Sequence, residues 1–215
     1  MDLPLDHRSG FAVVDVETTG FDPDHDRIVE VGVVVLDRAG REQGSFSSLV
    51  DPGRDPGPTH IHGISTSMVV GAPTFAAVRP SLADLLSGRV VVGHNVDRFD
   101  LEFLRAECRR SGGEVLVPGP LTTVDTLHLA QGHLALAGRA TLVDCCAHYG
   151  LSWEDHHRAL GDARVTAALF RSVRAQLGDE LLGLDQALYR ARGTVWPGGS
   201  GAPSAVRDRT DALVG

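Results

Sequence analysis

Two acidic residues, Asp15 and Glu17, stand two positions apart at the end of the first hydrophobic run, residues 11–14. Side chains alternate across a β-strand, so both carboxylates are expected on the same face. Two like charges buried together are costly unless a cation lies between them, and carboxylate oxygens suit a hard divalent ion. The pair therefore predicts a metal site. An exposed strand end in an acidic protein would give the same pattern.

The next residues, Thr18, Thr19 and Gly20, are typical of a turn. Two hydroxyl groups and exposed backbone N–H groups would suit an anion such as a phosphate. We therefore expect this turn to hold a phosphate beside the metal.

Further acids must come from more distant parts of the chain. Asp100 begins a helical pattern after the apolar run 89–93, at a helix start where the dipole favours a carboxylate. His157 and Asp162 are five residues apart, so on one helix they would point about 140° away from each other. His157 is therefore expected on a loop that precedes the helix carrying Asp162. Ordinary polar residues near helix starts remain the alternative.

Hydrophobic periodicity predicts the elements that would position these residues. Strands are expected over 11–16, 28–36, 41–50, 89–93 and 121–124, and helices over 74–86, 99–110, 125 onward, 141–149, 160–177 and 181–188. A short helix is expected after Ser65 or Thr66, and Pro80 is expected to kink its helix or mark a late start. This order predicts an α/β fold, with a mixed sheet and helices on its faces.

The 215 residues are 42% hydrophobic and 22% charged, which predicts one globular domain over residues 1–193. Residues 194–215 are rich in Gly, Pro and Ser and predict a flexible tail. The net charge of −8 does not predict nucleic-acid binding by bulk electrostatics, although bound cations would neutralise the acids locally. All 20 basic residues are Arg.

Three cysteines, Cys108, Cys145 and Cys146, lack the spacing of a zinc cluster or a disulfide framework. They predict reduced, packed thiols and a cytoplasmic location. The chain begins without a signal-peptide pattern and has no apolar run long enough to span a membrane.

Six motifs in order carry a resemblance to a known family: DVETTG, IVEVG, IHGI, GHN with FDLEFL, VDTL, and HRALGDA. From about residue 10 to residue 175 the chain resembles the DEDDh (DnaQ-like) exonucleases, which include the epsilon proofreading subunit of bacterial DNA polymerase III and RNase T. The resemblance implies an RNase H-like fold. Its five-stranded mixed sheet would contain three antiparallel strands plus two parallel ones, flanked by helices. It also implies removal of nucleotides from 3′ ends with two divalent ions.

The resemblance assigns the four metal-binding acids to Asp15, Glu17, Asp100 and Asp162, and the general base to His157. His156 is the rival base, one residue further from the last acid. Mg²⁺ or Mn²⁺ is expected over Zn²⁺, because all of the metal ligands are carboxylates.

One spacing departs from the bacterial members of the family. Three residues, 96–98, separate His-Asn from Phe-Asp, where the bacterial members usually have two. Either the loop holds an extra residue and Asp100 is the third acid, or Asp97 has taken that role. The helix register through Leu101 and Leu104 favours Asp100.

Substrate contacts are also implied by the resemblance. Thr18 and Thr19 would meet the terminal nucleotide, His62 and Ile64 its base or sugar, and Asn95 and Phe99 the second nucleotide. Ile64 and Phe99 would equally suit the core. Asp125 and Thr126 are expected to cap the start of a helix.

The function expected is hydrolysis of phosphodiester bonds at the 3′ end of single-stranded DNA, releasing nucleoside monophosphates in proofreading or repair. A DNA polymerase is the expected protein partner, with no membrane association. An exoribonuclease is the alternative within the same chemistry, and a non-catalytic polymerase-associated module is the alternative outside it.

Overall fold

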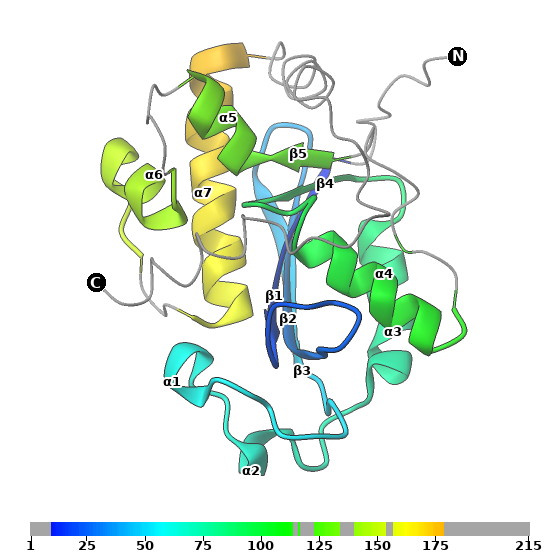
Figure 1. The fold of residues 1–215 in the computed structure, drawn as a ribbon. Coiled ribbons are helices and arrows are strands. Elements are labelled where there is room, and N and C mark those ends of the chain that lie inside the picture. The colour runs from blue at the N-terminus through cyan, green and yellow to red at the C-terminus, as the bar shows by residue number, and fades with distance from the viewer. Residues whose placement is uncertain (1–9, 114–115, 117–122, 134–139, 154–156, 179–215) are drawn as a thin grey trace.

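The computed structural model describes residues 10–113, 116, 123–133, 140–153 and 157–178 (Figure 1). The predicted tail at 194–215, the helix predicted at 181–188 and His156 lie outside these residues. Five strands form one sheet in the order β3-β2-β1-β4-β5. They are β1 (Phe11–Thr18), β2 (Ile28–Leu36), β3 (Glu42–Leu49), β4 (Val90–Gly93) and β5 (Thr123–Asp125).

The sheet is mixed. β1 pairs antiparallel with β2, and β2 with β3, while β4 pairs parallel with both β1 and β5. The predicted five-stranded, RNase H-like arrangement is confirmed. β1 continues two residues beyond its predicted end because its ladder with β2 runs as far as Thr18, after an irregularity between Glu17 and Thr18.

Helices cover both faces of the sheet (Figure 1). α3 (Phe75–Leu86) and α4 (Asp100–Arg110) lie on one face, and α5 (Thr126–His133), α6 (Leu142–Tyr149) and α7 (Ala159–Leu177) on the other. α3 includes Pro80 within its length. Two single-turn helices, α1 (Thr59–His62) and α2 (Thr66–Val69), follow β3. α1 was not predicted, since four residues are too few for a helical period.

Strand alternation divides the core in two. Val14 and Val16 point into a cluster with α3 and α4, while Phe11 and Val13 pack against α7. The residues of β1 that continue the second face are acidic rather than apolar. The α7 face of the sheet therefore changes from a hydrophobic core to a polar site within one strand.

All three cysteines are buried and unbridged. Burial raises the pKa of Cys145 to about 12 and that of Cys146 to about 11. Thiols with such values are protonated at neutral pH and react slowly. Their burial agrees with the predicted packing of these side chains.

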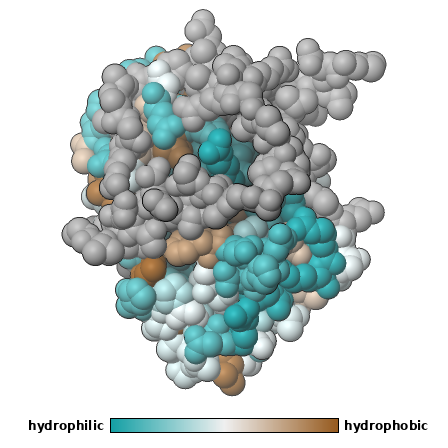
Figure 2. Space-filling view, viewed as in Figure 1, coloured by the Kyte–Doolittle hydropathy of each residue, from teal (hydrophilic) through white to brown (hydrophobic). Residues whose placement is uncertain are grey.

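The surface is polar over α4 and the loop that joins β1 to β2 (Figure 2). Exposed charges there include Asp22, Asp24 and Arg109. None of the helices in the described part of the chain combines the length and the apolar character needed to cross a bilayer.

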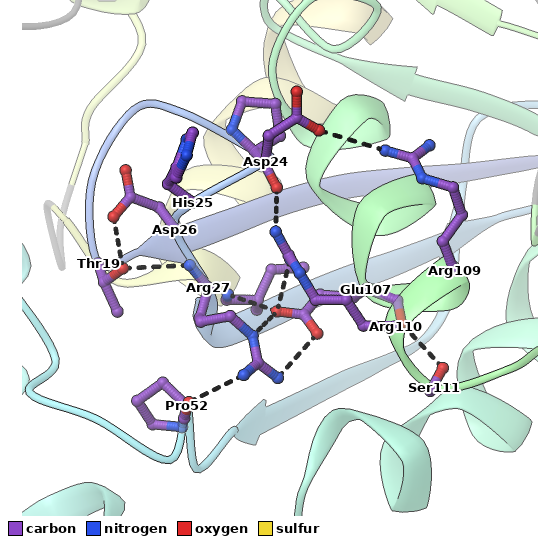
Figure 3. Close-up of polar contacts among 12 residues, drawn as sticks. Thr19, Asp24, His25, Asp26, Arg27, Pro52, Glu107, Arg109, Arg110 and Ser111 are labelled. Carbon is purple, nitrogen blue, oxygen red and sulfur yellow. Dashed lines mark hydrogen bonds and ion pairs between the residues drawn. The ribbon is translucent and has the colours of Figure 1, made fainter.

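An ion pair fastens the β1–β2 loop to α4 (Figure 3). Arg27 donates to the buried carboxylate of Glu107 through Nε at 2.6 Å and Nη2 at 3.0 Å, and its Nη1 donates to the carbonyl oxygen of Pro52 at 3.1 Å. The backbone N–H of Ile28 also donates to Glu107, and Arg110 approaches it at 3.5 Å. The loop that follows the acidic end of β1 is thus held from the opposite face of the sheet.

Replacing Arg27 with Met would leave the Glu107 carboxylate, 1% exposed, without its two-pronged partner. We expect the free energy of unfolding to fall by about 2–4 kcal/mol, because a buried charge that loses its closest partner is costly. Arg110 and the Ile28 N–H still compensate part of that charge, and Arg27 is itself partly exposed. Urea unfolding measures this. Arg109→Met is the matched control, since Arg109 lies 3.7 Å from Asp24 between well-exposed side chains and should contribute little. Equal losses for the two variants would contradict the account.

Candidate active site

Three carboxylates converge where the acidic end of β1 meets the start of α7. Asp15, Glu17 and Asp162 each offer an oxygen, and these oxygens all lie within 4.8 Å of one another. The side chains are buried, with 4%, 6% and 4% of their surface exposed. Three carboxylates held this close repel one another, and a divalent cation is the ordinary compensation. Their hard oxygen donors fit Mg²⁺ or Mn²⁺.

A glycine in β2 lets α7 come close enough to complete this group. Gly32 is paired with Asp15 across the β1–β2 ladder, so the two share a face of the sheet. A Cβ atom at Gly32 would lie 2.4 Å from the backbone of Ala159 and of Leu160. The first turn of α7 therefore rests directly on the β2 backbone, which brings Asp162 toward β1.

Asp100, the first residue of α4, reaches the same strand from the side. Its Oδ1 accepts a hydrogen bond of 2.9 Å from the backbone N–H of Val16, the residue between the two acids of β1. β4 pairs with β1 only as far as Val13. Beyond that point the Asp100 carboxylate, which is 1% exposed, accepts the backbone N–H of β1 that a paired strand would otherwise accept.

Asp97 belongs to a different group. Its Oδ1 accepts a hydrogen bond of 2.8 Å from the Thr123 hydroxyl, and it lies with Asp125 and His128 in a second cluster. Burial raises the pKa of Asp97 to about 6, and the charge of Asp125 adds to this effect. Of the two candidates for the third acid, Asp100 is the one that contacts β1 between Asp15 and Glu17.

His157 precedes α7, as expected for a loop residue. It has a φ of 60°, a left-handed conformation that is uncommon for a residue with a side chain. Trp153 links it to the acids: the indole Nε1 donates to Asp162 Oδ1 at 3.1 Å, and the indole and imidazole centroids are 6.4 Å apart. The imidazole thus lies on the side of the site formed by Trp153 and the first turn of α7.

Glu30 and Arg158, which were not predicted from the sequence, are joined by a two-pronged ion pair with a shortest distance of 2.7 Å. Glu30 is 1% exposed and is paired with Glu17 across the ladder. A single charged residue within the apolar run 28–36 was the available signal. Its partner lies 128 residues away in sequence, so spacing could not identify it.

The expectation that Thr19 presents an exposed backbone N–H is wrong. That N–H donates to the carbonyl oxygen of Arg27 at 2.8 Å, and the Thr19 hydroxyl donates to Asp26 at 3.0 Å. The Thr18 hydroxyl donates to the carbonyl oxygen of Gly20 at 2.6 Å. These hydrogen bonds lie within the loop itself, and the acceptor of the Thr19 N–H could not be predicted from local residue types. Side-chain contact with a nucleotide stays a prediction.

His62 and Ile64 are both buried, at 2% and 0% exposure. The backbone N–H of Ile64 donates to His62 Nδ1 at 3.0 Å, and the Ile64 side chain packs with Val29 and Val69. Burial lowers the pKa of His62, and the nearby charge of Glu30 acts in the opposite direction. The Ile64 side chain thus packs in the core, and contact of His62 or Ile64 with a nucleotide stays a prediction.

Asn95 and Phe99 begin and end the loop that delivers Asp100. Asn95 has a φ of 64°, and its N–H donates to Asp125 Oδ1 at 2.9 Å. The same oxygen accepts the N–H of Leu127 at 3.0 Å, which agrees with the predicted capping role of Asp125. Phe99 packs on Phe103 at 5.0 Å between ring centroids and is 7% exposed. Contact of Asn95 or Phe99 with a second nucleotide stays a prediction.

Comparison with known proteins places this geometry in a family. The family model described as Exonuclease matches residues 12–170. The chain belongs to the exonuclease family. The predicted membership among the DnaQ-like 3′→5′ exonucleases is confirmed.

Relatives of this exonuclease-family chain include replication proteins. The DNA polymerase III subunit epsilon of Treponema pallidum (strain Nichols) is 36% identical over 172 residues, which cover 77% of this chain and 76% of that protein. A PolC-type DNA polymerase III of Clostridium perfringens is 33% identical over 173 residues, covering 80% of this chain but only 12% of the relative. The chain thus matches most of an epsilon subunit and a small part of a PolC-type polymerase.

The fold is shared with solved nuclease structures. E. coli Exonuclease I in complex with a dT13 oligonucleotide matches with a TM-score of 0.72 and 20% identity. The match covers 84% of this chain and 45% of the Exonuclease I chain. At that identity the likeness establishes the fold.

In this exonuclease-family chain, Gly32→Ala is expected to lower the free energy of unfolding by about 1–3 kcal/mol, because the added methyl group must displace the backbone of α7. Gly44→Ala is the matched control on neighbouring β3, where a Cβ atom would have nothing within 4 Å. Urea denaturation measures both. Similar stabilities for the two variants would show that α7 does not rest on Gly32.

Asp97→Asn tests the second cluster. The pKa of Asp97 rises from 3.8 to about 6 on folding, so between these values the folded state keeps a proton that the unfolded chain has released. Stability therefore falls as pH rises through this window. The neutral amide removes that loss, and its oxygen can still accept a hydrogen bond from Thr123.

Urea unfolding at about pH 4 and about pH 7 should show the variant gaining stability over the parent only at the higher pH. An Asp97→Asn variant that is less stable than the parent at neutral pH would contradict the raised pKa.

Proposed function

We propose that this domain is a divalent-metal-dependent 3′→5′ exonuclease that hydrolyses the 3′ end of single-stranded DNA and releases nucleoside monophosphates. The observation that carries the proposal is the convergence of Asp15, Glu17 and Asp162, three buried acids whose oxygens lie within 4.8 Å of one another. Buried carboxylates at this density suit a cation-binding centre far better than a stabilising core.

Asp15, Glu17 and Asp162 would hold the cations, and Asp100 would complete the set from the side of β1. Mg²⁺ or Mn²⁺, two ions per site, would supply Lewis-acid stabilisation of the charge that develops on the scissile phosphate. Within the protein, Asp100 is fixed by Val16 and Asp162 by Trp153. Both carboxylates are therefore oriented before a ligand arrives, which reduces the cost of organising the site.

His157 would accept the proton of the attacking water. Imidazole titrates near neutral pH, so it can take up a proton there without strong prior activation. Its position just before α7, beside Trp153, suits a base that acts next to Asp162.

The DNA substrate is proposed on the strength of the relatives. Several are DNA polymerase III epsilon subunits or PolC-type polymerases, and one structural neighbour was solved with a dT13 oligonucleotide. These names support DNA as the polymer, proofreading or repair as the context, and a DNA polymerase as a partner.

The proposed activity is tested with purified protein, a 5′-labelled single-stranded DNA oligonucleotide and Mg²⁺ or Mn²⁺. The parent chain should release mononucleotides from the 3′ end and lose activity with EDTA. Asp15→Asn and Asp100→Asn should each lower the rate at least about 100-fold, because each removes a ligand charge.

Asp97→Asn is the control, since Asp97 lies in the other cluster, and it should retain activity. An active Asp15→Asn variant would overturn the proposal. Loss of activity in Asp97→Asn but not in Asp100→Asn would transfer the third role to Asp97. Faster degradation of a matched RNA oligonucleotide would identify an exoribonuclease instead.

A further inference from the structure

We propose that Glu30 and Arg158 form a positioning pair that fixes His157 at the entry to α7. The inference rests on the proposed function, in which His157 is the base. Neither residue is expected to touch substrate or metal. Their role is to hold the chain at the junction between the loop and the helix, with the imidazole immediately before the pair and Asp162 one turn after it.

The contacts concentrate on one carboxylate. Arg158 Nε donates to both oxygens of Glu30 at 3.1 Å, and Nη2 donates to Oε1 at 2.7 Å. The backbone N–H of Ala159 donates to Oε2 at 3.0 Å. Both oxygens of Glu30 are thus engaged by the start of α7. This separates Glu30 from the three acids that form the candidate metal group.

Glu30 also serves as a helix cap supplied by the sheet. Arg158 is the N-cap residue of α7, and its own side chain makes no capping hydrogen bond. The first N–H groups of a helix need acceptors from outside the helix. Glu30, rigid within β2 and 1% exposed, provides one for Ala159. The carbonyl oxygen of Arg158 then accepts the N–H of Asp162 at 2.9 Å, which starts the helix.

His157 needs such an anchor because its backbone is strained. His157 has a φ of 60°, which is unfavourable for a residue with a side chain relative to a right-handed conformation. That conformation persists only where the neighbouring residues are held in place. The adjacent Arg158 is held by a buried carboxylate, and the two-pronged geometry restrains rotation as well as distance.

Charge gives a second reason for the pair. Glu30 stands opposite Glu17 in the β1–β2 register, so two carboxylates lie side by side on one face. The Arg158 guanidinium neutralises Glu30 and leaves Glu17 to serve the cation site. The pair thus separates a structural carboxylate from a ligating one.

Glu30→Gln tests the proposal because the amide oxygen can still accept from Ala159 while the ion pair is lost. The full chain is assayed with Mn²⁺ and single-stranded DNA. We expect kcat to fall about 10–100-fold, as for other residues that orient a functional side chain, with KM unchanged. Arg158→Lys keeps the positive charge but loses the two-pronged guanidinium contact, so its kcat should lie between those of the parent and Glu30→Gln. Arg164→Gln is the matched control, an exposed Arg on the same helix.

A double-mutant cycle separates positioning from general damage. His157→Ala alone should lower kcat about 10²–10⁴-fold. Adding Glu30→Gln to it should cause no further loss, because the group being positioned is already absent. An equal loss in both backgrounds, or a rise in KM alone, would overturn the proposal. If circular dichroism shows that Glu30→Gln does not fold, Arg158→Lys replaces it in the same double-mutant cycle, since the Arg158 side chain is half-exposed.

Amide hydrogen exchange gives a readout that does not depend on activity. Residues 157–160 should exchange faster in Glu30→Gln than in the parent, while the end of α7 is unchanged. Unchanged exchange at 157–160 would contradict the positioning role. If Glu30→Gln exchanges faster at residues 157–160 but the parent releases no nucleotide, the exonuclease function is refuted, while the structural role of the Glu30–Arg158 pair stands.

Discussion

The register between β1 and β2 determines the site. It places Asp15 opposite Gly32 and Glu17 opposite Glu30, all on the face that α7 covers. A slip of one residue would turn the side chains of one strand over relative to the other, so Asp15 and Glu17 would no longer share a face with Gly32 and Glu30. In the observed register, Gly32 has no side chain, so α7 can approach the sheet closely. Glu30 supplies the carboxylate that accepts the N–H of Ala159 at the start of α7. Both consequences bring Asp162 toward β1.

Buried carboxylates in this fold are either paired with an arginine or clustered with other acids. Glu30 and Glu107 are each matched by an arginine fork, from Arg158 and Arg27, and each fastens a loop or helix start to the sheet. The acids at the end of β1 are instead gathered with a third acid within reach of a single ion. The Arg158–Glu30 pair holds the start of α7, which carries Asp162, on the sheet without the help of a cation. This suits a site that is organised before metal and substrate bind.

The sequence predicted those features that depend on local periodicity. Alternation along β1 predicted the shared face of Asp15 and Glu17, and helical spacing predicted that His157 precedes the helix of Asp162. The helix register favoured Asp100 over Asp97, but its contact with the Val16 N–H could not be predicted, because that contact depends on where β4 stops pairing with β1. The N–H of Thr19 was misjudged because its acceptor, the carbonyl of Arg27, lies across the loop.

The central claim is that acids distant in sequence form one cation-binding centre. Calorimetric titration of the metal-free protein with Mn²⁺, in the absence of nucleic acid, tests it most directly. The account predicts saturable binding of about two ions per chain, with at least one ion lost in Asp162→Asn. Identical Mn²⁺ binding by the parent and Asp162→Asn would contradict it, because α7 would then contribute nothing to the metal centre.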